Sequence, residues 1–459
     1  MSFYDTILGN LPQIKGPTQK KLDLRVKFKW TLIVLVSYFI LSEITLFGLS
    51  QNSLTQFQAL SVLLGAEFGS LVSLGIGPIV TASIVLQLLN GSGIIKFDTT
   101  STAGRSRFQG TSKLLAYCFV VFEAIIYVAV GGLAPDPALT GSVTYLVLQL
   151  LLMLQLIMGG FVIILLDDLV SKWGIGSGIS LMIAAGVAKS LFIQTLSFFP
   201  NPQNPEYMVG AIPSAIQALA RADIAIFRES IVAIIATIFI FLLVVFFQSM
   251  KVEIPLSFGR VRGYGIRWPL NFLYTSVIPV LLIAALLANI QIGLSLLESK
   301  MGWVAAGSLA GWFTAPSLVL DIARTGTLSL GWLEYVQAIV YVIILMIGAL
   351  VFSFFWMQTS GMDAHSQAKQ IMASGLQIPG FRKDPRIMEH VLNRYIIPLT
   401  VMGGLTIGFL AGFADVIGSL TQGTALLLAV MIVYKFYEDV AKSHMMDMNP
   451  MMRKFMGGK

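Results

Sequence analysis

Long apolar runs separated by short polar segments dominate this sequence. Ten of them approach the ~20 residues that a helix needs to cross the hydrocarbon core of a bilayer. They are Trp30–Leu49, Leu74–Leu89, Leu114–Leu133, Val143–Leu166, Ile179–Leu196, Ile231–Phe247, Phe272–Leu296, Tyr335–Met357, Ile396–Phe413 and Gly418–Tyr434. The pattern predicts ten transmembrane helices, of which the second and the tenth are short.

The stretch between Glu43 and Lys96 departs from this pattern, because Glu67 is its single charge. It is too long for one membrane helix and barely long enough for two. Glycine permits unusual backbone angles and proline suits the first turn of a helix, so a glycine- and proline-containing break in the middle predicts a new helix behind it. Irregular backbone at membrane depth is tolerated only beside protein or a water-filled cavity, which indicates a pore or transport path. The break consists of Gly75, Gly77 and Pro78.

Lysine and arginine positions indicate which apolar segments cross, because short cytoplasmic loops carry an excess of both. With ten spans and a cytoplasmic N-terminus, 25 of the 30 basic residues lie on the cytoplasmic side. If Leu54–Val72 also spanned, only 11 of the 30 would lie there, and if Gly302–Leu320 spanned, 16 would. We therefore predict that Leu54–Val72 enters from outside without crossing. Gly302–Leu320 is expected to be a partly helical external loop.

Ten spans divide into five and five, with the external stretch Ser197–Glu229 between the halves. An odd number of spans per half gives the second half the opposite topology, as in inverted repeats. The inference rests on topology alone. The expected organisation is a cytoplasmic arm (1–29), a first half (30–196), a hinge loop (197–230), a second half (231–434) with cytoplasmic loops 248–271 and 358–394, and a cytoplasmic tail (435–459).

Composition agrees with a polytopic membrane protein. Hydrophobic residues make up 56% of the chain and charged residues 12%, against about 25% charged in soluble domains. The mean hydropathy is +0.82. The single cysteine, Cys118, excludes an intrachain disulfide and a cysteine-based metal site. Residues 1–29 lack the apolar core of a signal peptide, so we expect no cleaved leader.

Two predicted cytoplasmic loops are long and basic. In the first, apolar and basic residues alternate over 251–267, which is typical of a hairpin projecting from the membrane. Such loops suit an anionic partner, either ribosomal RNA or lipid headgroups. Charge alone fits equally well with loops that only enforce topology. The candidate partner-binding residues are Arg260, Arg262, Arg382, Lys383 and Arg386.

Four motifs, in chain order, resemble the SecY/Sec translocon alpha-subunit family. Their residues resemble archaeal or eukaryotic members more than bacterial ones. They are LGIGPIVTASIVLQLL at 74–89, GIGSGIS at 174–180, Arg262-Gly263 followed by LYTSVIP at 273–279, and NRYIIP at 393–398. The resemblance covers nearly the whole chain. It implies an all-α fold of two inverted five-helix halves that open like a clamshell around an hourglass pore. Leu54–Val72 then matches a plug helix in the external funnel, with Leu54, Leu60, Leu63, Gly65 and Phe68 as plug residues.

The resemblance also implies a ring of bulky aliphatic side chains at the pore constriction. Two pairs of these residues are four positions apart and so share a helix face, which by itself would indicate ordinary helix packing. An aliphatic ring excludes ions when the pore is empty and yields around a passing chain. The expected ring residues are Val80, Ile84, Ile179, Ile183, Leu281 and Leu428, with the neighbours Leu282 and Leu427 as alternatives for the last two.

Polar residues inside predicted spans are few, so each is a functional candidate. Thr81, Glu123 and Asn289 match the family's polar cluster at the lateral gate, the seam through which hydrophobic segments reach lipid. Hydrogen bonds among them would favour the closed seam, although such residues can also simply join helices. Glu43 and Asp415 lie near span ends, where we expect them to be solvated or paired.

Three other classes of protein fit the sequence less well. A secondary transporter usually needs charged or strongly polar groups near the midplane, where the second and fifth spans are aliphatic. An intramembrane enzyme needs reactive groups at depth, whereas His365, His390 and His444 lie in predicted cytoplasmic segments. A scaffold would leave the plug segment without a purpose. The resemblance instead implies a passive channel for secretory polypeptides, with lateral release of transmembrane segments, no catalysis, no cofactor and no metal.

The resemblance further implies partners and a location. The family works with a SecE-like gamma subunit and a small beta subunit, and it meets the ribosome, the nascent secretory polypeptide with its signal sequence, and membrane lipids. The sequence has no nucleotide-binding loop, so a partner must drive movement. We expect a multi-pass protein of an archaeal plasma membrane with both termini in the cytoplasm.

Overall fold

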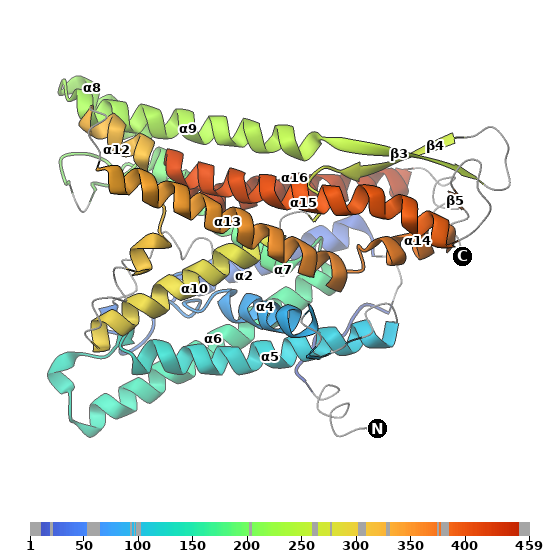
Figure 1. Cartoon of the computed structure of the whole chain (residues 1–459). Helices are drawn as coiled ribbons and strands as arrows, with labels where there is room; N and C mark the ends of the chain where they lie inside the picture. The colour runs from blue at the N-terminus through green and yellow to red at the C-terminus, as the bar shows by residue number, and fades with distance from the viewer. Residues whose placement is uncertain are drawn as a thin grey trace.

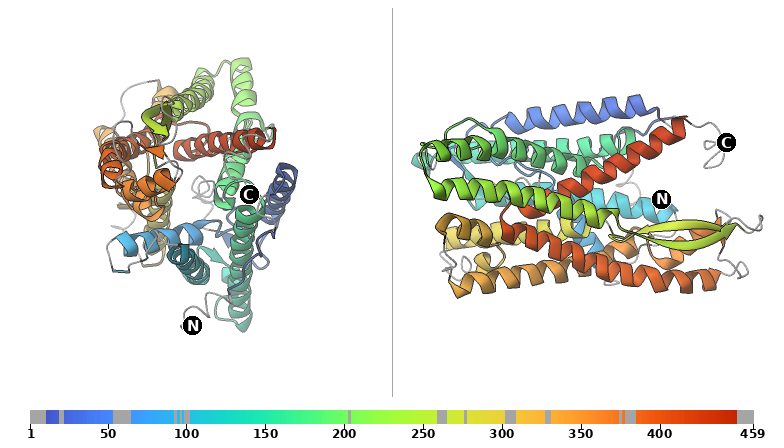
Figure 2. Two further views of the ribbon diagram at one scale, coloured as in Figure 1. Left: turned by 90° about the vertical axis from the view of Figure 1, so that its right-hand side faces the viewer. Right: turned by 90° about the horizontal axis from the view of Figure 1, so that it is seen from above.

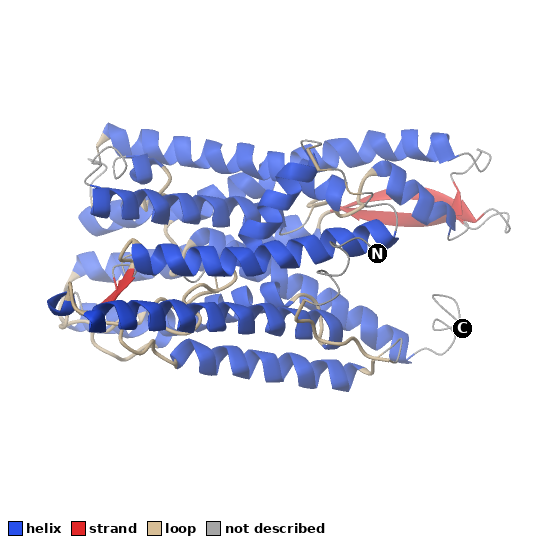
Figure 3. Cartoon of the chain, turned by 90° about the horizontal axis from the view of Figure 1, so that it is seen from below, coloured by secondary structure: helices blue, strands red, loops and turns tan. Residues whose placement is uncertain are grey.

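The computed structural model describes residues 11–18, 22–52, 65–91, 94–95, 97, 102–201, 204–258, 265–275, 278–301, 309–326, 331–373, 376–377 and 385–448. Most of these residues are helical, and the long helices run side by side along one axis (Figure 1). The described strands lie at the two ends of the helix bundle (Figure 3).

Each predicted span coincides with a helix. These helices are α2 (Leu24–Glu43), α4 (Gly77–Gly91), α5 (Thr102–Ala129), α6 (Val143–Trp173), α7 (Gly178–Leu196), α9 (Ile224–Ser249), α10 (Ile278–Met301), α13 (Trp332–Thr359), α15 (Pro385–Ile417) and α16 (Gly423–Met448). By length and composition, 7 described helices are apolar enough to cross a membrane: α5, α6, α7, α9, α10, α13 and α15. Of the other three, α4 has 15 residues, and α2 and α16 carry several charges.

Several helix ends differ from the predicted ones. α2 begins at Leu24, where the side chain of Asp23 accepts a hydrogen bond from the Leu24 N–H, and it ends at Glu43 instead of Leu49. α5 and α15 begin inside predicted cytoplasmic loops, and α16 continues to Met448, well past its predicted end. Hydropathy marks only the apolar core of a membrane helix. The true ends follow capping groups and polar residues that continue the helix into water.

The helices form two groups that follow the chain. α2, α4, α5 and α6 lie together on one side of the bundle, and α9, α13 and α15 lie on the other (Figures 1 and 2). α16 crosses from the second group and packs against α7. Buried side chains from both groups, including Leu152, Ile163 and Leu345, form one continuous apolar core. The two halves therefore meet along a shared apolar interface in the middle of the molecule.

The predicted hairpin between α9 and α10 is confirmed. Strands β3 (Lys251–Phe258) and β4 (Gly265–Asn271) pair antiparallel. A third strand, β5 (Leu376–Gln377), comes from the second predicted basic loop and pairs with the end of β3. That loop also contains α14 (Ala364–Ala373), which the sequence did not indicate. The two basic loops thus share one three-stranded sheet at one end of the bundle (Figure 1).

The opposite end of the bundle holds the predicted external connections. The stretch predicted as a hinge loop contains α8 (Ala211–Ala220), and the stretch predicted as a partly helical loop contains a helical turn at 309–312 and the start of α12 (Leu318–Thr325). Both helices lie at the end away from the hairpin (Figure 1). Here too the short strands β1 (Gln51–Asn52) and β2 (Leu133–Ala134) pair. The prediction of a partly helical loop is therefore confirmed for the described part of 302–320, whereas α8 is a helix that the sequence did not indicate.

We predict that replacing Gly159 in α6 by alanine lowers the thermal stability of the purified protein. An added Cβ at Gly159 would overlap the main-chain carbonyl of Leu71, so α6 and the turn before α4 would have to separate. Overpacking of this kind typically costs about 1–3 kcal/mol. The matched control is Gly293→Ala in α10, where nothing lies within 4 Å of the added atom. Equal melting temperatures for the two variants in detergent would contradict this close approach.

Candidate functional site

Two cavities open inside the helix bundle. The outer cavity, about 760 Å³, is lined by polar residues that include Glu67, Lys189 and Asp415. The inner cavity, about 550 Å³, is lined mainly by apolar residues, including Trp356. Gln87 is one of its polar lining residues. We use the names outer and inner because the first adjoins the end with α8 and α12 and the second adjoins the end with the hairpin. The structure therefore has two separate spaces along the axis of the bundle.

A buried apolar layer separates the two cavities. On α7, residues up to Ala184 line the inner cavity and residues from Gly186 line the outer one. On α16, Gly423 lines the outer cavity, and the lining of the inner cavity begins at Ile432. The intervening turns of α16 are buried, and Leu428 among them is fully buried. Both helices thus pass from one cavity to the other through aliphatic side chains.

The six predicted ring residues lie in or against the apolar core. Val80, Ile84, Ile183, Leu281 and Leu428 are buried in its extended cluster, and Ile179 packs against it. Val80, Ile179 and Leu281 also line the inner cavity. The alternative residues Leu282 and Leu427 are buried in the same cluster. Three of the six side chains therefore stand at the edge of the inner cavity.

The segment just before α4 lies on the outer side of this layer. Ala66 and Glu67 line the outer cavity. A Cβ built at Gly65 would lie 3.7 Å from the Met182 Cβ and 3.8 Å from the Ile183 nitrogen, so the backbone here touches α7 at a predicted ring residue. The segment thus covers the layer from outside.

In the predicted plug segment 54–72, the described part is not helical. Residues 65–72 form turns, and Gly65 and Gly69 have positive φ angles of 52° and 99°. The hydroxyls of Ser70 and Ser73 bond to main-chain groups of the same turns, which competes with helix formation. Phe68 packs against the apolar core. The predicted plug residues Leu54, Leu60 and Leu63 lie outside the described residues.

The break between this segment and α4 has the predicted chemistry. Gly75 adopts a positive φ of 53°, a conformation that side chains disfavour. α4 then begins at Gly77, with Pro78 in its first turn, where a missing N–H costs nothing. A Cβ at Gly77 would lie 3.3 Å from a carboxylate oxygen of Glu123. The small residue therefore lets α5 approach the start of α4.

The three predicted gate residues form one hydrogen-bonded cluster. The Asn289 side-chain amide donates to the Thr81 hydroxyl over 3.0 Å. That hydroxyl lies 3.3 Å from a Glu123 carboxylate oxygen and 2.9 Å from the Gly77 carbonyl, and its single proton serves one of them at a time. Because Thr81 lies on α4, Glu123 on α5 and Asn289 on α10, the cluster links the first half of the chain to the second.

Sequence reasoning missed the polar network of the outer cavity. The Lys189 ammonium lies 2.8 Å from a Glu43 carboxylate oxygen and 3.4 Å from one of Glu67. Asp415 is buried. Its carboxylate is paired, because it accepts hydrogen bonds of 2.8 Å from the Tyr341 hydroxyl and from the Thr424 N–H. The available signals were Glu67 as a lone charge and Lys189 as a basic residue on the external side of the charge count.

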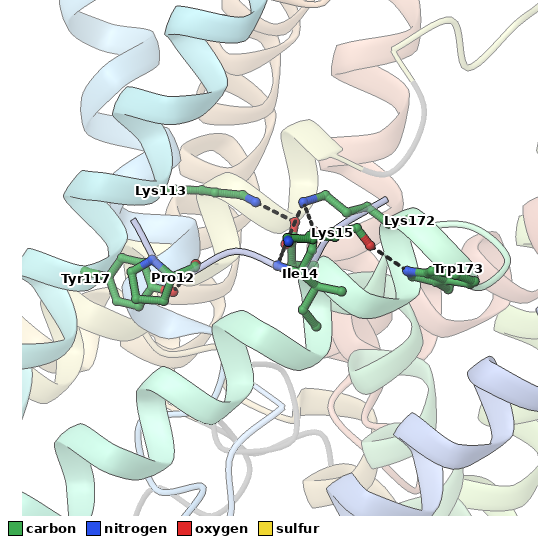
Figure 4. Close-up of polar contacts among 8 residues, drawn as sticks. Pro12, Ile14, Lys15, Lys113, Tyr117, Lys172 and Trp173 are labelled. Atoms are coloured by element: carbon green, nitrogen blue, oxygen red, sulfur yellow. Dashed lines mark hydrogen bonds and ion pairs between the residues drawn. The ribbon is translucent and has the colours of Figure 1, made fainter. Parts of the chain in front are cut away.

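The N-terminal arm is fixed across α5 and α6 (Figure 4). Asp168 is at the centre: its side chain is 6% exposed, pairs with Lys113 and with Lys172 at 2.8 Å, and accepts a hydrogen bond from the Ile14 N–H. The Tyr117 hydroxyl donates to the Pro12 carbonyl, and the Trp173 indole donates to the Lys15 carbonyl. These bonds reach the main chain of the arm, so sequence patterns gave no hint of them.

Most of the predicted partner-binding residues lie outside the described residues. These are Arg260, Arg262, Arg382 and Lys383. Arg386 is described and is exposed in the first turn of α15. The Tyr274 hydroxyl donates to the Met362 carbonyl over 2.7 Å and joins the two loops. Burial and the nearby Asp363 carboxylate raise the pKa of Tyr274 far above its ordinary value, so the hydroxyl stays protonated and keeps this bond at neutral pH.

Metal ligands do not gather in the part of the chain that the structure describes. No group of three or more His, Cys, Asp or Glu side chains there is placed to hold an ion. The chemistry of the two cavities is therefore that of aliphatic packing, hydrogen bonds and a few ion pairs.

Comparisons with known proteins agree with each other. The SecY family profile matches residues 70–437, and the profile of the plug domain of Sec61p matches residues 36–69. The protein translocase subunit SecY of Pyrococcus furiosus is 40% identical over 460 residues, covering 97% of each chain. A solved protein-conducting channel has a TM-score of 0.80 at 38% identity, over 96% of this chain and 97% of that one. Sec61 in the canine ribosome-channel complex from the endoplasmic reticulum has a TM-score of 0.76 at 38% identity, over the same shares of the chains.

These likenesses extend over nearly the whole chain and include both halves and the plug region. The predicted fold class is confirmed: an all-α polytopic membrane protein with two inverted five-helix halves and a plug.

We predict that Asp168→Ala loosens the N-terminal arm. The change leaves the ammonium groups of Lys113 and Lys172 and the N–H of Ile14 without their shared acceptor, which should cost about 1–3 kcal/mol. Trypsin should cleave after Lys15 several times faster, and the melting temperature should fall. Lys15→Ala is the stability control, because only the Lys15 carbonyl takes part in the contact. A wild-type cleavage rate in Asp168→Ala would mean that Asp168 does not hold the arm.

Proposed function

The chain belongs to the SecY family, and we propose on that basis that it is the central pore-forming subunit of a Sec protein translocase. It is a passive channel that carries secretory polypeptides across the membrane and releases transmembrane segments sideways into lipid. The observation that carries this proposal is the aliphatic layer between two cavities, with the segment before α4 lying on its outer side. The chain itself performs no chemical step in this process.

The proposed ring explains how such a channel stays tight when idle. Its aliphatic side chains offer water and ions no hydrogen bonds, so a narrow opening between them empties of water. A polypeptide that enters from the inner cavity pushes the same side chains apart, and no directional bond has to break. Polar side chains at these positions would hold water and leak. The burial of Val80, Ile84, Ile183 and Leu428 in a common cluster supports this role.

The cluster of Thr81, Glu123 and Asn289 suits the proposed lateral gate. The bond from Asn289 to Thr81 joins α10 to α4 and thus joins the two halves of the chain. The contact of Thr81 with Glu123 adds α5. Hydrogen bonds between membrane helices contribute about 0.6 kcal/mol each on average. A seam held by so few weak bonds closes by default and opens when an arriving apolar segment gains more by partitioning into lipid. The break at Gly75, Gly77 and Pro78 would let α4 pivot.

The proposed partners follow from the relatives and from the basic loops. The canine Sec61 relative was solved in a ribosome-channel complex, which supports binding of the ribosome at the hairpin end. There, Arg260, Arg262, Arg382, Lys383 and Arg386 would contact ribosomal RNA phosphates. A SecE-like gamma subunit and a small beta subunit would complete the complex. Archaeal relatives and the charge count support an archaeal plasma membrane with both termini in the cytoplasm.

Replacing the aliphatic side chains of the proposed ring by polar ones should make the idle channel leak. We predict that serine at Val80, Ile84, Ile179 and Ile183 together raises ion conductance in planar bilayers at least tenfold, because hydroxyl groups hold water in the constriction. A matched variant places serine at Ile235 and Ile238, which are exposed on α9, and should stay tight. Wild-type conductance in the ring variant would remove these residues from the seal. Crosslinking of a stalled secretory chain to the same positions tests the path directly.

Charge reversal in the two basic loops should weaken ribosome binding. We predict that Arg262→Glu with Arg382→Glu reduces the affinity of proteoliposomes for ribosomes at low salt by about tenfold or more, since phosphate contacts dominate such binding. The loss should shrink as salt rises. Arg221→Glu, on the external side in the charge count, is the control. Unchanged binding at low salt would exclude both arginines from the contact.

A further inference from the structure

The lone charge of the apolar stretch before α4 has a partner in the outer cavity. Glu67 is the single charged residue between Glu43 and Lys96. It lies within the region that matches the plug domain. Its carboxylate is 3.4 Å from the Lys189 ammonium, and Glu43 at the end of α2 lies 2.8 Å from the same ammonium. One lysine on α7 thus pairs with the carboxylate at the start of this stretch and with the one inside it.

The turn that carries Glu67 is locally rigid. The Ser70 hydroxyl donates to the Glu67 carbonyl, the Ser73 hydroxyl donates to the Ser70 carbonyl, and the Gly69 N–H donates to the Ser73 hydroxyl. The Leu46 N–H donates to the Gly69 carbonyl and so ties the turn to the chain that follows α2. The backbone that carries Glu67 is therefore held in one conformation. A contact made by this side chain positions the whole turn relative to α7.

Lys189 is placed to hold this turn against the proposed ring. It follows Ile183 on α7 by less than two helical turns, and the same stretch of α7 touches Gly65. Among the described residues, Glu67 supplies the one ion pair between the turn at 65–72 and α7. Glu43 gives the Lys189 ammonium a second partner, which keeps its long side chain extended across the cavity.

We propose that Lys189 holds the turn at 65–72 in its sealing position against α7 through its ion pair with Glu67. Lys189 is a positioning residue, and the inference rests on the proposed channel function. The exposure of the pair suits this role: the side chains of Lys189 and Glu67 are 30% and 45% exposed. A solvated ion pair is weak and re-forms easily, whereas a fully buried one would oppose displacement of the plug at every opening.

The test compares idle conductance of the full-length chain, purified with its co-expressed small subunits, in planar bilayers. Lys189→Met keeps the length of the side chain and removes its charge, and it should raise the open probability about two- to fivefold, the range expected for a solvated ion pair. Glu67→Gln should do the same. The double variant should leak no more than Lys189→Met alone, because Lys189→Met already removes the pair with Glu67. Lys189→Arg keeps the charge and should retain the wild-type seal.

The matched control is Arg221→Met, which removes an external pair at 3.2 Å with Glu206 away from the plug region, and should stay tight. Wild-type conductance in both Lys189→Met and Glu67→Gln, additive effects in the double variant, or failure of Lys189→Arg to retain the seal would overturn the proposal. The ring variant of the preceding section separates two kinds of failure. If that variant leaks and Lys189→Met does not, the tether alone is wrong. If neither leaks, the channel assignment is wrong as well.

Discussion

The structure depends on one constraint: an apolar layer must separate two cavities inside a bundle whose own surface is apolar. A helix bundle in lipid satisfies its backbone internally, so the layer can be made only from side chains that neighbouring helices contribute at the same height. α4, α7, α10 and α16 do so. Because the layer has no directional bonds, its closure depends on what presses against it from the outer cavity and on how firmly the two halves are joined.

Contacts in the described structure differ in strength according to whether the parts they join have to move. The arm on α5 and α6 is held by Asp168, a carboxylate almost fully buried between two lysines. The turn before α4 is held on the pore wall by the more exposed pair of Glu67 and Lys189. Between the halves, the polar cluster contributes the hydrogen bond from Asn289 to Thr81. Strong, buried contacts thus fix the frame, and weak ones hold the parts that we propose to move.

The hairpin end shows how two distant segments make one surface. The loops after α9 and α13 are far apart in the chain, yet β5 pairs with β3, and Tyr274 bonds to the Met362 carbonyl. The described parts of the two loops therefore share one sheet at this end of the bundle.

The sequence by itself determined the class, the order of the ten helices and the hairpin, because membrane spans and alternating strands leave periodic patterns that need no knowledge of neighbours. It also separated Leu54–Val72 and Gly302–Leu320 from the spans, since charge counting depends only on position along the chain. The motifs led to the family and thus to Val80, Thr81 and Asn289. Only the tertiary structure decided what these side chains touch. It turned 65–72 into turns instead of helix, buried Asp415 and joined Glu67 to Lys189. The Glu67–Lys189 pair joins residues 122 positions apart and the Tyr341–Asp415 bond joins residues 74 apart. No local pattern records a distance that only packing creates.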